Sequence, residues 1–357
     1  MIYLDYQATT PLAPEAREEM LRWLGGPEGD GFGNPHSAHR LGRAAAAAVE
    51  RARDRVAALF PAGGRVIFTG SATEAINLAM RGTRRKGAIA VSAIEHAAVL
   101  DTAQALGRAH ILPVDAQGFV QSDTPLPSDS AMVCVMQVNN EIGAVQDSVH
   151  WAKRARAAGA LFLSDAVQAA GKLPVAPADM IVVSAHKLYG PKGIGALWLA
   201  DGVELDAQIT GGGQEGGLRS GTLSPALCAG FGAAAKLALA RQAEDAAHIA
   251  KLWARARALF ADWQLNGPQD ARWHGNLNIR RDGLDVARLM SDCRDIAFSA
   301  GSACASGSGR PSHVLRAIGL TDAQAKSSIR LGFGRYITME SLEAAAAAIN
   351  DAASQQG

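Results

Sequence analysis

The chain has 357 residues, which is more than one hydrophobic core normally holds, so two or more subdomains are expected. Its 48% hydrophobic and 19% charged residues are ordinary for a soluble globular enzyme. A net charge of +1 without a long basic run argues against binding to nucleic acid or to an anionic membrane surface.

Targeting signals and membrane spans are not expected. The N-terminus has no basic region followed by an apolar one, and no run approaches the ~18 apolar residues of a membrane span. The four cysteines, at 134, 228, 293 and 304, are too sparse for a disulfide scaffold and form no C-x-x-C pair. These features predict a reduced, cytoplasmic protein without a metal site.

The first half of the chain alternates helical and strand-like segments. After a short strand-like start and a helical pattern at residues 15–24, Ser37 is predicted to cap a helix that extends to about residue 60. Several of the following strand candidates are apolar throughout, which predicts a mostly parallel seven-stranded sheet covered on both faces. The candidates are residues 65–69, 88–92, 109–114, 131–136, 161–164, 180–183 and 196–199.

A long alanine-rich helix, predicted for residues 225–263, suits a crossing between domains. Beyond it, strand patterns at residues 276–279, 296–299 and 328–331 alternate with helical patterns at 284–293, 312–318 and 341–353. The fold class is therefore α/β. We expect a large domain of residues 13–255 and a smaller α+β domain of residues 1–12 and 256–357.

Lys187 follows an apolar strand candidate and precedes a glycine-rich turn. A buried lysine is costly unless its pKa falls, and a neutral amine is what a covalent bond to an aldehyde requires. The alternative is a lysine that reaches solvent from the strand end. Asp165 ends another apolar strand candidate. An amine and an acid at the carboxyl ends of neighbouring strands suit pyridoxal 5′-phosphate (PLP), which needs a lysine for its aldehyde and an acid for its ring nitrogen.

Other segments have two interpretations each. Ser71 and Glu74 fit a helix-capping box, and the same helix start fits phosphate binding. His96 is either structural or suited to stacking on a flat ring. Residues 139–140 could cap a helix, shape a turn or reach a ligand, and the glycine-rich residues 211–222 could be a connector or a close approach of backbone to a ligand.

Cys304 lies among small polar residues in a predicted loop, whereas the other three cysteines lie in apolar or helical patterns. A loop cysteine is either without function or a nucleophile. Arg330 is either part of a surface salt bridge or a bidentate clamp on an α-carboxylate.

Several motifs together resemble the cysteine desulfurases of the class V aminotransferases. They are the YLDY start at residue 3, GNPHS at 33–37, HK at 186–187 with GPKG at 190–193, RSGT at 219–222, GSAC at 301–304 and SSIR at 327–330. The resemblance extends from residue 3 to about residue 335. It implies PLP as cofactor, the type I fold of PLP enzymes and a homodimer.

The resemblance also implies roles for individual residues. Lys187 would bind PLP and act as the base, Cys304 would be the nucleophile that forms a persulfide, and His96 would stack on the ring and act in proton steps. The other implied contacts are Asp165 to the ring nitrogen, Gln168 to the phenolic oxygen, Ala72 and Thr73 to the phosphate, Asn140 near the cofactor oxygen and the substrate, Ser184 and His186 in the cofactor motif, Thr222 to the phosphate of the neighbouring subunit, and Arg330 to the substrate carboxylate.

The expected reaction converts L-cysteine into L-alanine and passes the sulfur through Cys304 to an acceptor protein, for iron–sulfur clusters, a thio-cofactor or tRNA. Which acceptor is served stays open, because the chain ends soon after the helix at 341–353, where many family members continue. One alternative is another class V enzyme, an aminotransferase or a selenocysteine lyase. Another is a catalytically poor sulfur carrier or scaffold that keeps the fold.

Overall fold

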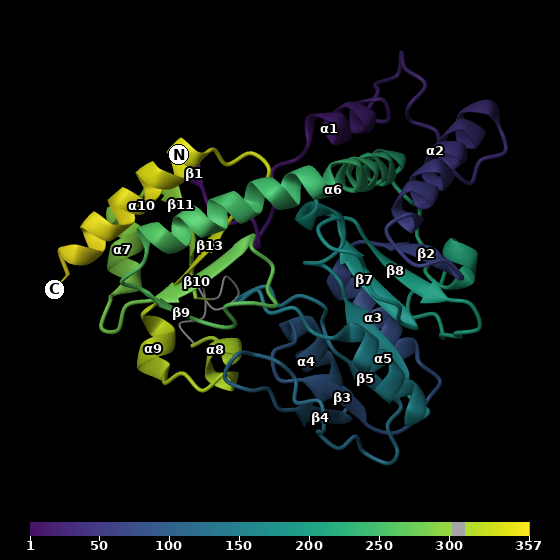
Figure 1. Cartoon of the computed structure of the whole chain (residues 1–357). Helices are drawn as coiled ribbons and strands as arrows, with labels where there is room; N and C mark the ends of the chain where they lie inside the picture. The colour runs from purple at the N-terminus through teal and green to yellow at the C-terminus, as the bar shows by residue number, and fades with distance from the viewer. Residues whose placement is uncertain (302–310, 357) are drawn as a thin grey trace.

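The computed structural model describes residues 1–301 and 311–356. Its largest element is a seven-stranded sheet with the strand order β2-β8-β7-β6-β5-β3-β4 (Figure 1). The strands are β2 (Gly64–Thr69), β3 (Ile89–Ser92), β4 (Ala109–Leu112), β5 (Met132–Cys134), β6 (Leu161–Asp165), β7 (Met180–Ser184) and β8 (Gly195–Ala200). All seven correspond to the predicted segments.

The pairing in this sheet is mostly parallel. Strands β4, β3, β5, β6 and β7 pair in parallel, and β8 is antiparallel to both of its neighbours, β7 and β2. A parallel pair needs a crossover, whereas β7 and β8 are joined by a short connection without an α-helix, which brings β8 back in the opposite direction. The predicted mostly parallel sheet is confirmed.

Helices cover both faces of the sheet, which explains why its strands are apolar throughout. Along β7, Met180 and Val182 pack in a cluster with α3 (Ala72–Gly82) and α4 (Ala97–Ala105). Ile181 and Val183 point to the other face, toward α2 (Arg40–Ala57) and α6 (Pro225–Leu259). Further along that second face lies α5 (Ser148–Ala157).

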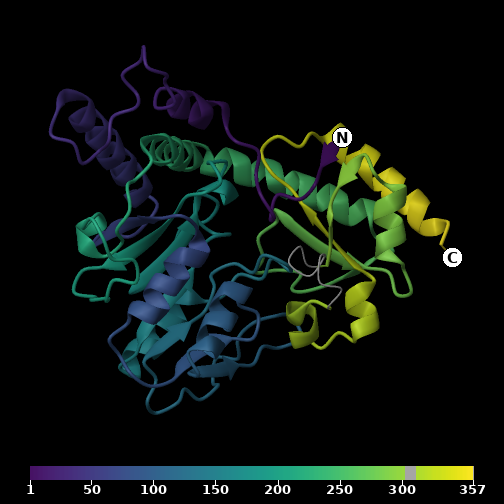
Figure 2. The same cartoon turned by 180° about the vertical axis from the view of Figure 1, so that it is seen from behind.

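The C-terminal part contains a four-stranded antiparallel sheet of order β12-β13-β10-β9. The first strand, β1 (Ile2–Tyr3), pairs in parallel with β11 (Ile296–Ala297), so the N-terminus lies against this part (Figures 1 and 2). The exact domain limits at residues 12 and 255 stay a prediction. The remaining elements are β9 (Gln264–Leu265), β10 (Asn276–Arg280), β12 (Ser299–Ala300), β13 (Ser328–Gly332), α1 (Pro14–Leu21), α7 (Val286–Asp292), α8 (His313–Ala317), α9 (Asp322–Lys326) and α10 (Met339–Ser354).

Two local predictions are wrong. Helix α2 is capped by His39, whose ring nitrogen Nδ1 accepts from the amide of Gly42 at 3.3 Å, and not by Ser37. The amide of Ser37 donates to the carbonyl of Asn34 in a turn, which keeps Ser37 outside the helix. The predicted strand at 296–299 is two short strands, β11 and β12, which pair in different sheets.

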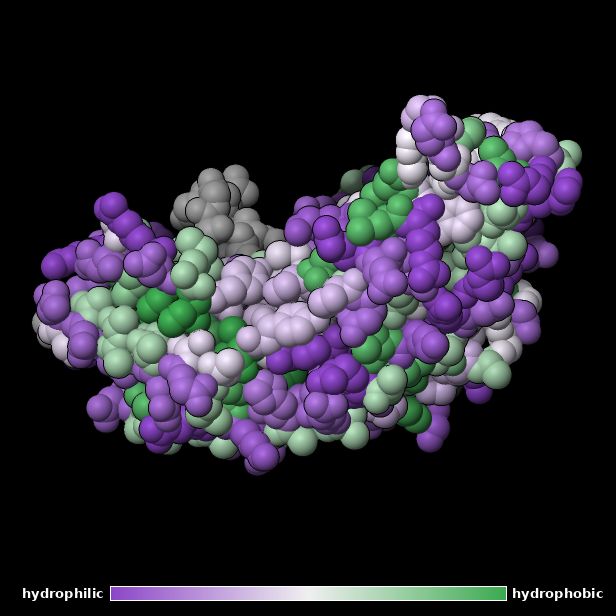
Figure 3. Space-filling view, turned by 90° about the horizontal axis from the view of Figure 1, so that it is seen from above, coloured by the Kyte–Doolittle hydropathy of each residue, from purple (hydrophilic) through white to green (hydrophobic). Residues whose placement is uncertain are grey.

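Within the described part of the chain, no helix combines the length and apolarity that a membrane span requires. The face seen in Figure 3 has its apolar side chains in several separate areas between polar ones.

Candidate active site

Ten of the predicted site residues surround one cavity of roughly 330 Å³. It lies at the carboxyl ends of the parallel strands, because β6 ends at Asp165, β7 ends at Ser184, and the start of α3 and the loops after β3 and β5 complete the wall. The ten residues are Ala72, Thr73, His96, Asn140, Asp165, Gln168, Ser184, His186, Lys187 and Arg330. A second hollow of roughly 390 Å³, between α2, β2 and the 215–223 segment, contains none of them.

Lys187 ends a short 3-10 helix, Ala185–Lys187, that follows β7. Its amine donates to two main-chain carbonyls of the N-terminal segment, that of Gln7 at 2.6 Å and that of Ala8 at 2.7 Å. These carbonyls hold the amine at the cavity wall, so Lys187 does not extend into bulk solvent from the strand end. Gln7 and Ala8 could not be predicted as contacts of Lys187 from their residue types, because every residue has a main-chain carbonyl.

Asp165 presents a buried carboxylate to the same cavity. Its Oδ1 accepts from the amide of Val167 at 2.9 Å, and Oδ2 has no hydrogen-bond partner among the described residues. Burial raises the pKa of Asp165, while the Val167 amide and the charges of His96 and Lys187 oppose that rise. A cationic ring nitrogen is the kind of partner that would keep such a carboxyl group ionised.

The two histidines of the cavity are held in defined orientations. Nδ1 of His96 accepts from the amide of Ala98 at 3.1 Å at the start of α4, so its proton in the neutral form is on Nε2. Burial lowers the pKa of His96. Nδ1 of His186 lies 3.1 Å from Oγ1 of Thr9, and burial, together with the nearby lysines, lowers the pKa of His186 to about 4. Both rings are therefore neutral near pH 7.

The start of α3 is capped by Ser71 and also has amides that are free to bind a ligand. The hydroxyl of Ser71 accepts from the amide of Glu74 at 3.2 Å, which confirms Ser71 as the cap of α3. The Glu74 carboxylate accepts from the amide of Gly70 at 2.7 Å and not from that of Ser71, so the reciprocal bond of a capping box is not formed. The amides of Ala72 and Thr73, which lack acceptors within the helix, lie at the cavity and suit an anion.

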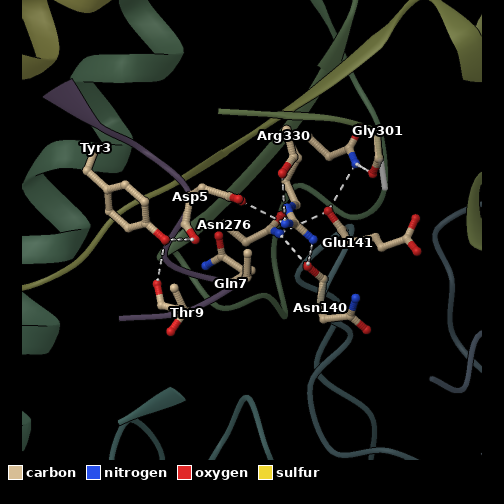
Figure 4. Close-up of polar contacts among 12 residues, drawn as sticks. Tyr3, Asp5, Gln7, Thr9, Asn140, Glu141, Asn276, Gly301 and Arg330 are labelled. Carbon is tan, nitrogen blue, oxygen red and sulfur yellow. Dashed lines mark hydrogen bonds and ion pairs between the residues drawn. The ribbon is translucent and has the colours of Figure 1, made fainter. Parts of the chain in front are cut away.

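Arg330 is buried on β13 with 1% of its surface exposed, so the surface salt bridge is excluded. Its Nη2 donates to Oδ1 of Asp5 at 2.8 Å and its Nη1 to the carbonyl of Asn140 at 3.1 Å, as Figure 4 shows. Its Nε has no partner among the described residues. The neighbouring Asn139 is committed to a turn, since its Oδ1 accepts from two following amides, which leaves Asn140 at the cavity.

Two predicted residues are not among these ten. Thr222 is exposed and does not line the cavity. Cys304 lies outside the described residues, so its role stays a prediction. The other cysteines, Cys134, Cys228 and Cys293, are buried, as expected of packed side chains.

The residues present fit PLP. An amine, a buried carboxylate, a neutral imidazole and a helix start with free amides surround one cavity, and each matches a different part of that cofactor. The family model of class V aminotransferases matches residues 2–344. The chain belongs to the class V aminotransferases.

Relatives within this family are cysteine desulfurases. Cysteine desulfurase IscS of Shewanella sp. (strain MR-4) is 42% identical over 96% of this chain and 90% of the relative. The IscS of Rickettsia akari is 40% identical over 96% of this chain and 88% of its own length. These matches confirm the resemblance and support the cysteine desulfurase function.

Similar solved structures confirm the fold. A NifS-like protein from Rickettsia africae has a TM-score of 0.90 at 29% identity, with 99% of both chains covered. The structure titled "SspA in complex with cysteine" has a TM-score of 0.82 at 31% identity and covers 95% of this chain and 100% of that one. The type I fold of PLP enzymes is therefore the fold of this chain.

Proposed function

We infer that this class V protein is a cysteine desulfurase that uses PLP to convert L-cysteine into L-alanine and leaves the sulfur on Cys304 as a persulfide. The observation that carries this inference is the single cavity in which Lys187, Asp165 and the start of α3 meet, in a chain 40–42% identical to cysteine desulfurases. Arg330 at the same cavity would select an amino acid as substrate.

Each residue around the cavity would hold a different part of the cofactor. Lys187 would bind its aldehyde carbon, Asp165 would accept a hydrogen bond from the protonated ring nitrogen, and the amides of Ala72 and Thr73 would bind its phosphate. When bound, PLP supplies an electron sink for the carbanion that loss of the α-proton creates. His96 would lie against the ring.

The proton steps belong to Lys187 and His96. The carbonyls of Gln7 and Ala8 orient the Lys187 amine at the cavity wall, where it can take the α-proton of the substrate. His96 can exchange a proton only through Nε2, because its Nδ1 accepts from the amide of Ala98. Its lowered pKa keeps it neutral, with the hydrogen on Nε2, so this N–H can donate to a group of the substrate or the cofactor.

The transfer of sulfur to Cys304 requires no external oxidant. The Cys304 thiolate attacks the sulfur of the substrate, an S–S bond forms, and the C–S bond breaks. The electron pair of the broken bond stays with the substrate carbon, which takes up a proton and ends as L-alanine. The fork of Arg330 would hold the substrate carboxylate during these steps.

The homodimer and the acceptor protein belong to this proposal as well. The exposed position of Thr222 suits a contact with the phosphate in a second copy of the chain. An acceptor protein would take the sulfur from Cys304. We expect the desulfurase and its acceptor to act in the cytoplasm.

Replacing the nucleophile tests the proposal. We expect Cys304→Ala to lower sulfide release from L-cysteine by a factor of at least ~100, while the absorbance of bound PLP stays unchanged. Cys293→Ala, which removes a buried thiol at the C-terminal end of α7, is the matched control and should retain activity. Undiminished sulfide release from Cys304→Ala would contradict the proposal. A requirement for a keto acid, together with indifference to Cys304, would indicate an aminotransferase instead.

A further inference from the structure

Lys172 is a second lysine close to Lys187 that the proposed reaction does not use. It follows β6, and its Nζ donates to Oε1 of Gln168 at 2.9 Å. Within residues 1–301 and 311–356, no carboxylate forms an ion pair with it. Burial lowers the pKa of Lys172 to about 7, and repulsion by Lys187 adds to the effect. Such a costly group would be retained for what it does to Gln168, its one hydrogen-bond partner among the described residues.

The side-chain amide of Gln168 is oriented from both ends. In its protonated form Lys172 can only donate, so the atom that faces it is then the oxygen Oε1. A carbonyl can only accept, so the atom that faces the carbonyl of Gln7, at 3.1 Å, must be Nε2. The same carbonyl accepts from Lys187. One hydrogen of Nε2 is thus engaged, and the second is left for the cavity that Gln168 lines.

We propose that Lys172 is a positioning residue that holds Gln168 with Nε2 toward the cofactor and, through this network, tunes the proton affinity of the nitrogen of Lys187. This inference rests on the proposed function and on the contact between Gln168 and the phenolic oxygen of PLP that the family resemblance implies. That oxygen is negatively charged, so an amide N–H stabilises it and a reversed amide would place Oε1 against it. Lys172, together with the carbonyl of Gln7, opposes the reversal.

The other polar groups near Lys172 are engaged elsewhere. A cavity of roughly 20 Å³, lined by Lys172, Tyr6, Tyr189 and Asp245, is too small for more than a water molecule. Asp245 is paired with Arg335 at 2.7 Å and with Arg241 at 3.3 Å. Burial raises the pKa of Tyr6 and of Tyr189, so both are neutral. The charge of Lys172 also contributes to the lowered pKa of His186, which is neutral near pH 7. Lys187 is therefore the charged group on which Lys172 acts.

The test follows the absorbance of the PLP-loaded enzyme against pH, without L-cysteine. Lys172→Met keeps the length of the side chain and removes both the donor and the charge. The absorbance changes when the Lys187 nitrogen loses its proton, and we expect the pH midpoint of this change to rise by about 1 unit. Loss of a nearby positive charge and loss of a donor to the phenolic oxygen both favour the protonated nitrogen. Lys172→Arg should restore the wild-type midpoint. Lys251→Met, which removes an exposed lysine of α6, is the matched control and should not change it.

A double-mutant cycle separates positioning from charge alone. In a Gln168→Leu background, Lys172→Met should shift the midpoint by clearly less than it does in the wild type. An unchanged midpoint in Lys172→Met, or a full shift without Gln168, would overturn the proposal. If Lys172→Met does not fold, Lys172→Gln, which keeps a polar end without the charge, is measured in its place. The midpoint is read without substrate, so an enzyme that binds PLP and releases no sulfide would refute the proposed function and leave this test intact.

Discussion

Arg330 is held in a fixed orientation and still has hydrogen-bond donors available for a substrate carboxylate. It is held by the carboxylate of Asp5 and the carbonyl of Asn140, while its Nε has no partner among the described residues. A buried guanidinium with donors to spare is incompletely satisfied, and a substrate carboxylate would complete its hydrogen bonds. The ion pair with Asp5 keeps its plane fixed in the meantime.

Arg330→Lys should therefore weaken substrate binding. A lysine offers a point charge in place of two parallel N–H donors, so we expect KM for L-cysteine to rise by about 10-fold or more, with a smaller change in kcat. Steady-state kinetics measures both constants. Arg280→Lys, on the neighbouring strand β10, is the control and should leave KM unchanged. An unchanged KM in Arg330→Lys would remove Arg330 from the substrate site.

Glu95 lies next to His96 and is fully buried. Its Oε1 accepts from the hydroxyl of Ser92 at 2.9 Å and from the amide of Met136 at 2.6 Å, and Oε2 has no partner among the described residues. Burial, together with the charge of Asp165, raises the pKa of Glu95 to about 8. The folded protein therefore carries this carboxyl group protonated at neutral pH, whereas the unfolded chain ionises it.

This difference predicts a pH dependence of stability. Between pH 4.5, the ordinary value, and about 8, the folded state binds one proton more at Glu95 than the unfolded state does. The free energy of unfolding should therefore fall as pH rises through this window, by up to ~1.4 kcal/mol per unit from this group. Glu95→Gln cannot ionise, so denaturation from pH 5 to 8 should show it gaining stability relative to the wild type. If the free energy of unfolding of Glu95→Gln varied with pH as that of the wild type does, the assigned pKa would be contradicted. As a control, replacing an exposed carboxylate in Glu204→Gln should leave the pH dependence of the wild type unchanged.

At the scale of elements, the ion pair of Arg53 and Glu215 joins α2 to the glycine-rich segment 211–222. The carboxylate of Glu215 accepts from both terminal nitrogens of Arg53, at 2.7 and 2.8 Å, and from the amide of Phe68 at 2.8 Å. Glu215 also adopts a φ of 52°, which is unusual without a glycine. These contacts hold the segment that carries Thr222 against β2.

Removing this carboxylate should destabilise the protein. Glu215→Ala leaves Arg53 and the amide of Phe68 without their buried partner, and we expect the free energy of unfolding to fall by about 3 kcal/mol. Chemical denaturation measures the loss. Glu50→Ala removes the exposed partner of Arg53 and should cost less than ~1 kcal/mol. Equal effects of the two variants would show that burial of the pair is unimportant.

Elements were predictable where local composition decides them. The seven strands of the large sheet were predicted because burial on both faces makes them apolar throughout, as β7 shows with its alternate contacts to α3 and α6. The split between β11 and β12 was not, because it depends on pairing with β1 and β13, which lie far away in the sequence. The prediction of Ser37 as the cap was wrong because a turn at Asn34 makes α2 begin later, with His39 as its cap.

The same distinction applies to the cavity. Lys187 and Asp165 were predicted because an amine and an acid at strand ends are chemically conspicuous. The carbonyls of Gln7 and Ala8 and the orphan oxygen of Glu95 were not, because they depend on main-chain placement and burial.

At the scale of the whole molecule, the exposed Thr222 would complete the site of a second copy. Thr222→Ala removes one hydroxyl donor to a phosphate, and we expect PLP to be lost about 10-fold faster on dialysis of the loaded enzyme. Thr210→Ala, an exposed threonine just before the same segment, is the matched control and should retain PLP as the wild type does. Equal retention in all three proteins would contradict an intersubunit role for Thr222.

The decisive measurement is the yield of sulfide and of alanine from PLP-loaded protein given L-cysteine and a reductant. A cysteine desulfurase should form both products, in equal amounts. Alanine without sulfide, or neither product from protein whose absorbance shows bound PLP, would contradict a cysteine desulfurase.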